Sequence, residues 1–375
     1  MNDRTPAEVF PPGEFVRDEL EERGWTQSDL AKIMCRPLPV INQIISGKKS
    51  ITPETAIGLS EAFGTSPELW LNLETAYQLS KVTAKSDNSV RERAKLFESA
   101  PVNDMQKRGW IRTANKISEL QDCLSTFFAL PEINRLKAAT LRTSAQEKEL
   151  SPEQLAWCVR ALQLAKSVPV KKYTNKVFEE GIPLLRTLAD FPENVKKVPK
   201  VLSEMGIRFV IVEHLPKSKI DGAALWLGDD WEKPVVALSL RYDRIDSFWH
   251  TLFHELSHIK NKDSFILDVD IVGADRCISN ATLSEIESRA NREAAEWLIP
   301  KEKMQSFISR TRPFYYTEKI IQFANLIKIH PGIIAGQLQY RKEIDWAANR
   351  LMLVKVRNVL VSSAMTDGWG TASSN

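Results

Sequence analysis

Residues 248–260 read FWHTLFHELSHIK and contain the pattern His-Glu-x-x-His. In a helix, His254 and His258 are four residues apart and project from the same face, where two imidazoles can bind one metal ion. Glu255 lies beside the first histidine, in a position to accept a proton from metal-bound water. The chain has only five histidines, so this spacing is expected by chance in well under ~1% of such sequences. The stretch therefore predicts a helix that carries a zinc site.

A hydrolytic zinc ion needs a third protein ligand and leaves its fourth position for water. The extended pattern HExxHxxGxxH is excluded, because Asn261 and Ser264 stand at its glycine and third-histidine positions. A glutamate from a following helix is the alternative, and LSEIESRANREAAEWLIP (283–300) places Glu287 close to an apolar helical face. A closed structural zinc site is disfavoured, because such sites usually contain several cysteines and Cys277 has none nearby. Four other acids compete for the ligand role, and we expect them to be solvated: Glu285, Glu293, Asp263 and Asp268.

Several polar residues near the motif are candidates to assist the chemistry. His250 lies one turn before the first histidine and Asn291 one turn after the glutamate, and we expect both to support the ligands rather than bind the metal. His330, in KIHPGIIAGQLQYR, is a candidate to polarise a scissile carbonyl, as are Tyr315 and Tyr316. For these three residues a purely structural role is the competing interpretation.

Three short strands are predicted before the motif helix. They are RFVIV (208–212), AALWLG (223–228) and PVVALSL (234–240), with the polar turn sequences KSKIDG and DDWEKP between them. Strands followed by the metal-binding helix predict an α+β domain of zincin-like architecture. In zinc peptidases such a sheet lies beside the active-site helix, and its edge strand pairs with an extended substrate.

The combination of HELSH with the later ExxANxxAAxxLIP resembles the ImmA/IrrE family of zinc metallopeptidases, over roughly residues 185–345. The resemblance implies that His254, His258 and Glu287 bind one Zn²⁺ ion per chain and that Glu255 is the general base. Asn291 matches the asparagine of the family's EAN segment. The sequence departs from the family pattern at two neighbouring positions, Arg289 and Glu293, which leaves the local packing open. Manganese or another divalent ion would suit the same ligands.

The N-terminal region is predicted to be a small helical bundle. Thr26 is placed to cap a helix over QSDLAKIM, and CRP forms a tight turn into LPVINQIISG, which ends at Gly47. Two short helices joined by such a turn are typical of the helix-turn-helix motif. The first helix has Phe15, Val16 and Leu20 at helical spacing. The inner face of the second is expected to consist of Gln27, Leu30, Ala31 and Ile33. The expected helices are 13–24, 27–34, 38–47, 54–64 and 66–79.

The segments GWTQSDLAKIM, INQIISGKKSITPETA and FGTSPELWLNLETAYQL resemble the HigA-like antitoxin branch of the Cro/repressor helix-turn-helix proteins. Relatives of this kind act as dimers on inverted-repeat operators and neutralise a small protein toxin. Residues 1–81 contain eight Lys and Arg against twelve Asp and Glu, a net charge of −4, yet residues 30–50 contain four basic residues and no acid. The second helix opens with Pro37-Leu38-Pro39-Val40, where many relatives carry polar residues. The candidates for DNA contact are Asn42 and Gln43 on bases, with Arg36, Lys48 and Lys49 on phosphates.

The chain divides by pattern into four parts. We expect a helix-turn-helix domain at 1–81, a helical connector at 82–184, the metallopeptidase domain at 185–350, and a C-terminal extension with a disordered tail at 351–375. No membrane-spanning run and no secretory leader are recognisable, and the four cysteines are scattered, so a cytoplasmic protein with reduced thiols is expected.

Together these features predict a bacterial transcriptional regulator or antitoxin fused to a zinc-dependent endopeptidase. One alternative is a DNA-binding antitoxin or sensor whose peptidase-like domain binds a partner or ligand without hydrolysis. A second is an enzyme whose N-terminal bundle serves only dimerisation or toxin binding.

Overall fold

The computed structural model describes residues 9–83, 89–129, 140–141, 148–263, 266–269 and 285–368. The chain divides into two compact units, residues 1–91 and residues 92–375, each with its own core. The side chain of Asp268, the residue Cys277 and the tail residues 369–375 lie outside the described part of the chain. In the part that is described, no helix combines the length and the apolar character needed to cross a membrane.

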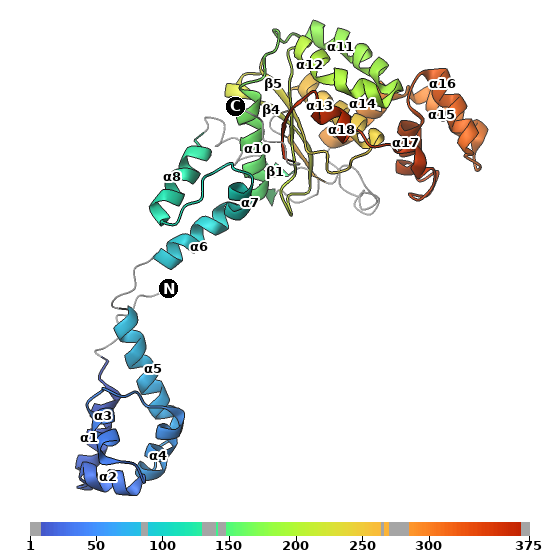
Figure 1. The fold of residues 1–375 in the computed structure, drawn as a ribbon. Helices are drawn as coiled ribbons and strands as arrows, with labels where there is room; N and C mark the ends of the chain where they lie inside the picture. The colour runs from blue at the N-terminus through green and yellow to red at the C-terminus, as the bar shows by residue number, and fades with distance from the viewer. Residues whose placement is uncertain are drawn as a thin grey trace. The chain divides into compact units, whose positions relative to one another are not determined.

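Between residues 9 and 83, the structure of the first unit consists of five helices (Figure 1). Local sequence explains their ends: the Thr26 hydroxyl accepts a hydrogen bond from the Asp29 amide, and the Thr52 hydroxyl accepts one from the Thr55 amide. Gly24 ends its helix in the left-handed conformation, with φ of 63°. The helix-turn-helix prediction is confirmed for this region. The helices are α1 (Pro12–Arg23), α2 (Gln27–Ile33), α3 (Leu38–Ile45), α4 (Pro53–Phe63) and α5 (Pro67–Thr83).

The core of the first unit contains side chains from all five helices, including Val16, Leu30, Ile41, Leu59 and Trp70. Of the expected inner face of α2, Leu30 and Ala31 are buried, but the prediction is wrong for Gln27, which is exposed, and for Ile33, which is 46% exposed. On α1, Phe15 is 37% exposed. The inward positions of these short helices are already filled by their neighbours.

The second unit combines a mixed sheet with helices on both of its faces. Its helices are α6 (Ser89–Ser99), α7 (Val102–Lys107), α8 (Ile117–Phe127), α10 (Pro152–Ala165), α11 (Asn175–Thr187), α12 (Val198–Glu204), α13 (Ile245–Asn261), α14 (Glu285–Leu298), α15 (Lys301–Thr311), α16 (Thr317–Ile327), α17 (Pro331–Tyr340) and α18 (Arg357–Val361). Short 3-10 turns are η1 (Leu188–Asp190), η2 (Pro192–Lys197), η3 (Leu227–Asp229) and η5 (Arg350–Met352). The strands are β1 (Thr140–Leu141), β2 (Lys148–Glu149), β3 (Arg208–Val212), β4 (Ile220–Trp226), β5 (Pro234–Leu238), β6 (Ile266–Val269) and β7 (Met365–Asp367).

The main sheet has the strand order β6-β4-β5-β3-β7. β3 pairs in parallel with β5 and β7, whereas β4 pairs antiparallel with β5 and β6. The three predicted strands are present, with changed bounds for two of them. β4 begins at Ile220, in residues expected in a turn, and ends at Trp226 rather than 228; β5 ends at Leu238 rather than 240. β4 is an interior strand, and β6 is the edge beyond it.

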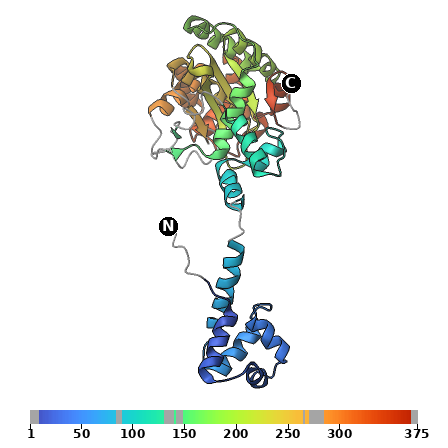
Figure 2. The same ribbon diagram turned by 90° about the vertical axis from the view of Figure 1, so that its left-hand side faces the viewer.

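Both faces of the sheet are apolar, and each is covered by helices. Along β3, Phe209 and Ile211 belong to the core shared with α13, whereas Val210 and Val212 belong to the core shared with α10. The indole N–H of Trp157, on α10, donates to the carbonyl of Val212 at 2.8 Å. Figure 1 and Figure 2 show α10 on one side of the strands and α13 with α14 on the other.

Two expected boundaries therefore change. Residues 92–184 are part of the second unit rather than a separate connector, because α10 covers a sheet face that would otherwise expose apolar side chains to water. This stretch also contains the short antiparallel pair of β1 and β2 in addition to helices.

The expected disordered tail is also corrected in part, because residues 365–367 form β7. Asp367 is buried, accepts a hydrogen bond from the indole N–H of Trp110 at 3.0 Å and is ion-paired with Arg160. Its main-chain carbonyl accepts from the amide of Glu213 at 2.9 Å. These contacts join the C-terminal strand to segments far earlier in the chain.

Candidate functional site

Helix α13 carries the histidine pair and lies in the interior of the second unit. Its apolar residues Phe248, Leu252 and Leu256 belong to the large core that also contains α14, α16 and α17. The polar residues His254, Glu255 and His258 are buried with no exposed surface. Burying three ionisable groups is costly unless they have polar partners or a metal, so their environment indicates a built site.

Three potential ligand atoms converge at the contact between α13 and α14. The Nε2 atoms of His254 and His258 are 3.0 Å apart, and the Glu287 carboxylate lies 3.2 Å from the first and 3.7 Å from the second. Two imidazole nitrogens on a tetrahedral zinc ion are about 3.3 Å apart, given Zn–N distances of about 2.0–2.1 Å. The two histidines and Glu287 are therefore close enough for one metal ion to contact all three, and the ligand set stays a prediction.

Asp263 orients one of the two histidines. The Nδ1–H of His258 donates to the Asp263 carboxylate at 2.9 Å, which leaves Nε2 directed at the cluster. Arg289 donates to the same carboxylate at 2.7 Å. Burial acts to raise the pKa of Asp263, but the hydrogen bonds from His258 and Arg289 outweigh it and lower the pKa below its ordinary value. Asp263 was expected to be solvated, and instead it is hydrogen-bonded to both His258 and Arg289.

Glu293 likewise makes contacts between α14 and α13. The Glu293 carboxylate accepts hydrogen bonds from Ser257 at 2.6 Å, Lys260 at 3.0 Å and Asn261 at 3.2 Å. Burial acts to raise the pKa of Glu293, and these donors lower it below its ordinary value. Glu293 thus joins α14 to the C-terminal end of α13, rather than being solvated as expected. Of the other competing acids, Glu285 is exposed.

The carboxylate of Glu255 lies against strand β4 rather than in the ligand cluster. A Cβ atom built on Gly222 would overlap the Glu255 carboxylate and would lie 2.9 Å from Cγ2 of Thr251. Glycine is therefore required at this position of the strand. The sequence contained this glycine in KSKIDG, but its only local interpretation was a turn.

Of the residues expected to assist catalysis, His250 and Asn291 lie close to the histidine pair, whereas His330 has a structural contact elsewhere. The ring of His250 lies 6.1 Å from that of His254, measured between centroids, and its Nε2 is 3.3 Å from Oδ1 of Asn291. His330 caps α17 by accepting from the amide of Gly332 at 3.1 Å, and burial lowers its pKa. Its cap contact supports the structural interpretation rather than a catalytic one.

The two tyrosines are likewise engaged in local structure. The Tyr315 hydroxyl donates to Glu343 at 2.7 Å, and Tyr316 is 57% exposed with its ring stacked on Phe314.

In the first unit, the candidate DNA-contacting residues lie around α3. Asn42 and Gln43 are exposed, because Ile41, Ile44 and Ile45 occupy the inner face of the helix. The amides of Lys48 and Lys49 both donate to the carbonyl of Gln43, at 2.8 and 3.0 Å, and their side chains are exposed.

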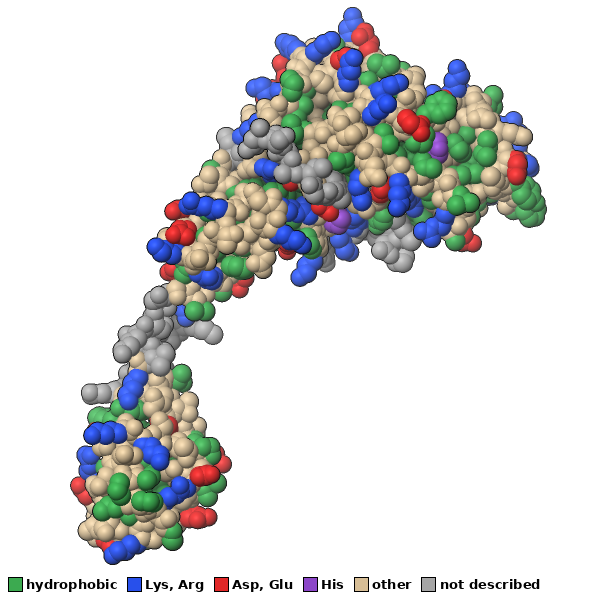
Figure 3. All heavy atoms as spheres, viewed as in Figure 1, with side chains coloured by type: hydrophobic (Ala, Val, Ile, Leu, Met, Phe, Trp, Pro, Cys, Tyr) green, Lys and Arg blue, Asp and Glu red, His purple; other side chains and the backbone are tan. Residues whose placement is uncertain are grey.

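Arg36 forms an ion pair within the first unit, with its guanidinium 3.3 Å from the carboxylate of Glu54. Leu38 is 40% exposed at the start of the same helix. On the face of the first unit drawn in Figure 3, basic, acidic and hydrophobic side chains are interspersed.

Comparison with known proteins concerns this first unit. The family model described as Helix-turn-helix matches residues 16–70. The HTH-type transcriptional regulator YddM of Escherichia coli K12, itself uncharacterized, is 33% identical over 78 residues, which are 21% of this chain and 83% of that protein. Virulence-associated protein I of Dichelobacter nodosus is 39% identical over 69 residues, which are 18% of this chain and 64% of that protein. A solved addiction module antidote protein of the HigA family from Coxiella burnetii is 37% identical, with 21% of this chain and 88% of that chain covered and a TM-score of 0.21.

Proposed function

Because this chain belongs, through its N-terminal unit, to the helix-turn-helix family of transcriptional regulators, we propose that it is a DNA-binding regulator whose second unit hydrolyses a peptide bond at a metal centre. The observation that carries the enzymatic half is the convergence of His254, His258 and Glu287, with Glu255 adjacent in sequence to the first ligand. The regulatory half rests on the family and on the exposed polar residues of α3.

DNA binding is assigned to α3 and the turn that follows it. Asn42 and Gln43 present amide groups that can hydrogen-bond to base edges, and Lys48 and Lys49 supply charge for phosphates. We expect a homodimer on an inverted-repeat operator, with a small protein toxin as a further partner, as the resemblance to HigA-like proteins implies. The test is a mobility shift with the DNA upstream of the chain's own gene.

Lysine variants make the DNA test specific. Lys48→Ala together with Lys49→Ala should weaken binding and reduce the dependence of log K on log salt by about 2, one unit for each lysine that no longer meets a phosphate. Lys200→Ala, in the second unit, is the matched control and should bind as the wild type does. Unchanged affinity and salt dependence in the double variant would remove α3 and its turn from the DNA interface.

In the second unit, zinc bound by the three ligands would supply an acidified water and polarise the substrate carbonyl. Glu255 accepts the proton from the attacking water and afterwards delivers it to the leaving amine. Asp263 keeps His258 in the tautomer whose Nε2 faces the metal. Gly222 leaves room for the Glu255 carboxylate beside β4.

A second candidate function is supported by the burial of the cluster. His254, Glu255 and His258 have no exposed surface, and a peptide must reach Glu255 to be cut. A domain that binds a metal and senses or holds a partner without hydrolysis needs no such access. In this case the metal would be present and Glu255→Gln would leave the regulatory effect unchanged.

The deciding experiment combines metal content with the base variant. Purified wild-type protein should contain about one zinc ion per chain, Glu287→Ala should contain much less, and Glu255→Gln should retain zinc. Proteomic comparison of cells that express wild type or Glu255→Gln should then reveal a cleavage product that only the wild type generates. Folded protein without bound metal would reject both functions of the second unit.

A further inference from the structure

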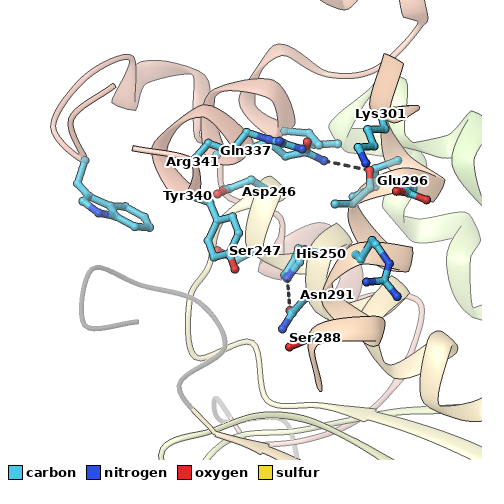
Figure 4. Close-up of a pocket in the computed structure, with 16 residues that line it drawn as sticks. Asp246, Ser247, His250, Ser288, Asn291, Glu296, Lys301, Gln337, Tyr340 and Arg341 are labelled. Carbon is cyan, nitrogen blue, oxygen red and sulfur yellow. Dashed lines mark hydrogen bonds between the residues drawn. The ribbon is translucent and has the colours of Figure 1, made fainter. Parts of the chain in front are cut away.

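A cavity of about 380 Å³ lies between α13, α14 and α17, beside the cluster of His254, His258 and Glu287. His250 and Asn291 form the wall nearest to the cluster, one helical turn from His254 and Glu287 respectively. Figure 4 shows these two side chains facing each other on one side and Gln337 and Tyr340 of α17 on another. A volume of this size accommodates a small ligand or a short peptide segment.

Three polar atoms in the wall are buried and, within the described part of the chain, have no hydrogen-bond partner: Oγ of Ser247, Nδ2 of Asn291 and Oε1 of Gln337. Ser247 is 4% exposed and Asn291 is 9% exposed. The second polar atom of each amide side chain does have a partner. Oδ1 of Asn291 lies 3.3 Å from Nε2 of His250, and Nε2 of Gln337 donates to the Ala295 carbonyl at 3.2 Å. Asn291 is thus left with a donor and Gln337 with an acceptor. Native proteins rarely leave such groups unpaired, so they point to a ligand.

The rest of the wall indicates the character of that ligand. Leu298 and Ile333 are buried apolar residues of the wall. The carboxylate of Asp246 is already bound by Arg244 at 2.6 Å. The cationic residues of the wall, Arg292, Lys301 and Arg341, are exposed and therefore solvated. The interior of the cavity consequently suits a neutral group with one donor and one acceptor on an apolar body.

We propose that this cavity binds an apolar residue of a peptide, with Asn291 donating to a peptide carbonyl and Gln337 accepting from a peptide N–H. A peptide unit carries one acceptor and one donor, which are the partners that the two side chains lack. Ser247 adds a hydroxyl that can pair with a second peptide group. That the bound peptide is a substrate, and that its apolar residue lies next to the bond that is cut, rests on the proposed function.

Binding is measured on full-length Glu255→Gln protein, so that hydrolysis cannot interfere. The probes are N-acetyl-L-leucinamide and N-acetyl-L-phenylalaninamide, and N-acetylglycinamide is the analogue without an apolar side chain. Titration calorimetry, or chemical-shift changes of the probe, should show that at least one of the two apolar probes binds about tenfold or more tightly than the glycine analogue. Equal affinities for all three probes, or no binding at millimolar concentration, would overturn the proposal.

Two variants test the named atoms. Ser247→Ala and Gln337→Met should each weaken binding of the apolar probe about 5- to 10-fold, because each removes one hydrogen bond. Their melting temperatures should not fall, since each removes a buried group that lacks a partner and the Ala295 carbonyl still accepts from the amide of Ile299 at 2.9 Å. Gln322→Met, at an exposed position of α16, is the control and should bind as the parent does. Unchanged affinity in both test variants would overturn the proposal.

Failure of this inference is distinct from failure of the proposed function. Suppose that the probes bind, that both variants bind them more weakly, and that wild-type protein cuts no substrate. The cavity assignment then stands and the peptidase proposal fails. If wild-type protein cuts a substrate with the same KM in Ser247→Ala and Gln337→Met, the peptidase proposal stands and the cavity assignment fails.

Discussion

Asp263 accepts a hydrogen bond from Nδ1 of His258 at 2.9 Å, and Arg289 holds the same carboxylate at 2.7 Å. The ion pair of Asp263 and Arg289 links the C-terminal end of α13 to helix α14. A carboxylate in this position fixes the tautomer of a metal-binding histidine and increases its basicity. Arg289 therefore helps to hold the carboxylate that orients His258 in the proposed metal site.

Asp263→Asn should lower zinc affinity about 10- to 100-fold, because the amide holds the histidine less firmly than a carboxylate does. Competition with a chromogenic chelator measures this affinity. Glu293→Gln is the matched control, since Glu293 also joins α13 to α14 but contacts neither histidine. We expect its zinc affinity to stay within about threefold of wild type, and an equal loss in both variants would mean that helix packing, not orientation of His258, sets the affinity.

Gly222→Ala should place a methyl group in the space of the Glu255 carboxylate. We expect a loss of about 1–3 kcal/mol in the free energy of unfolding, typical of an overpacked core. A double-mutant cycle with Glu255→Ala identifies the cause: the double variant should recover part of the loss, because the overlapping carboxylate is gone. Purely additive effects would place the strain at Thr251 instead.

Much of the local structure follows from the sequence because it depends on neighbours in the chain. The four-residue spacing of His254 and His258 makes them face the same way in any helix. Thr26 and Gly24 mark helix ends through hydrogen bonds and backbone conformations that involve only a few residues. Strand β3 was predicted with its observed bounds, 208–212, because apolar residues there are continuous and polar residues follow.

The features that sequence reasoning missed depend on contacts between distant segments. Asp367 meets Trp110 across 257 residues, and nothing near Asp367 indicates that partner. The same holds for Asp263, which looks like a solvated loop acid until α14 brings Arg289 beside it. Gly222 was assigned to a turn because only the packing of α13 against β4 shows what its missing side chain makes room for.

Asp367→Ala should therefore destabilise the second unit strongly. The substitution leaves the guanidinium of Arg160 and the indole N–H of Trp110 without their shared partner in a largely buried place, which costs about 3–5 kcal/mol. Urea denaturation followed by far-UV circular dichroism measures the loss. Glu180→Ala, which breaks an exposed pair with Lys176 on α11, should hardly change the midpoint. A midpoint for Asp367→Ala as close to wild type as that of Glu180→Ala would refute the role of β7 as an anchored strand.

Tyr315 should make the stability of the protein fall at alkaline pH. Burial, with the hydrogen bond to Glu343 at 2.7 Å, raises the pKa of Tyr315 to about 12 from a value near 10 in the unfolded chain. Below pH 10 both states keep the phenol proton, and the stabilising contribution is fully present. Between pH 10 and 12 the unfolded chain loses this proton while the folded chain keeps it, so the contribution declines as the pH rises, by up to about 1.4 kcal/mol per pH unit. Denaturation curves between pH 8 and 11.5 should accordingly show a shallower alkaline decline for Tyr315→Phe than for wild type, whereas Tyr316→Phe, which alters an exposed side chain, should follow wild type. Identical slopes for all three proteins would show that the Tyr315 hydroxyl does not keep its proton in the folded state.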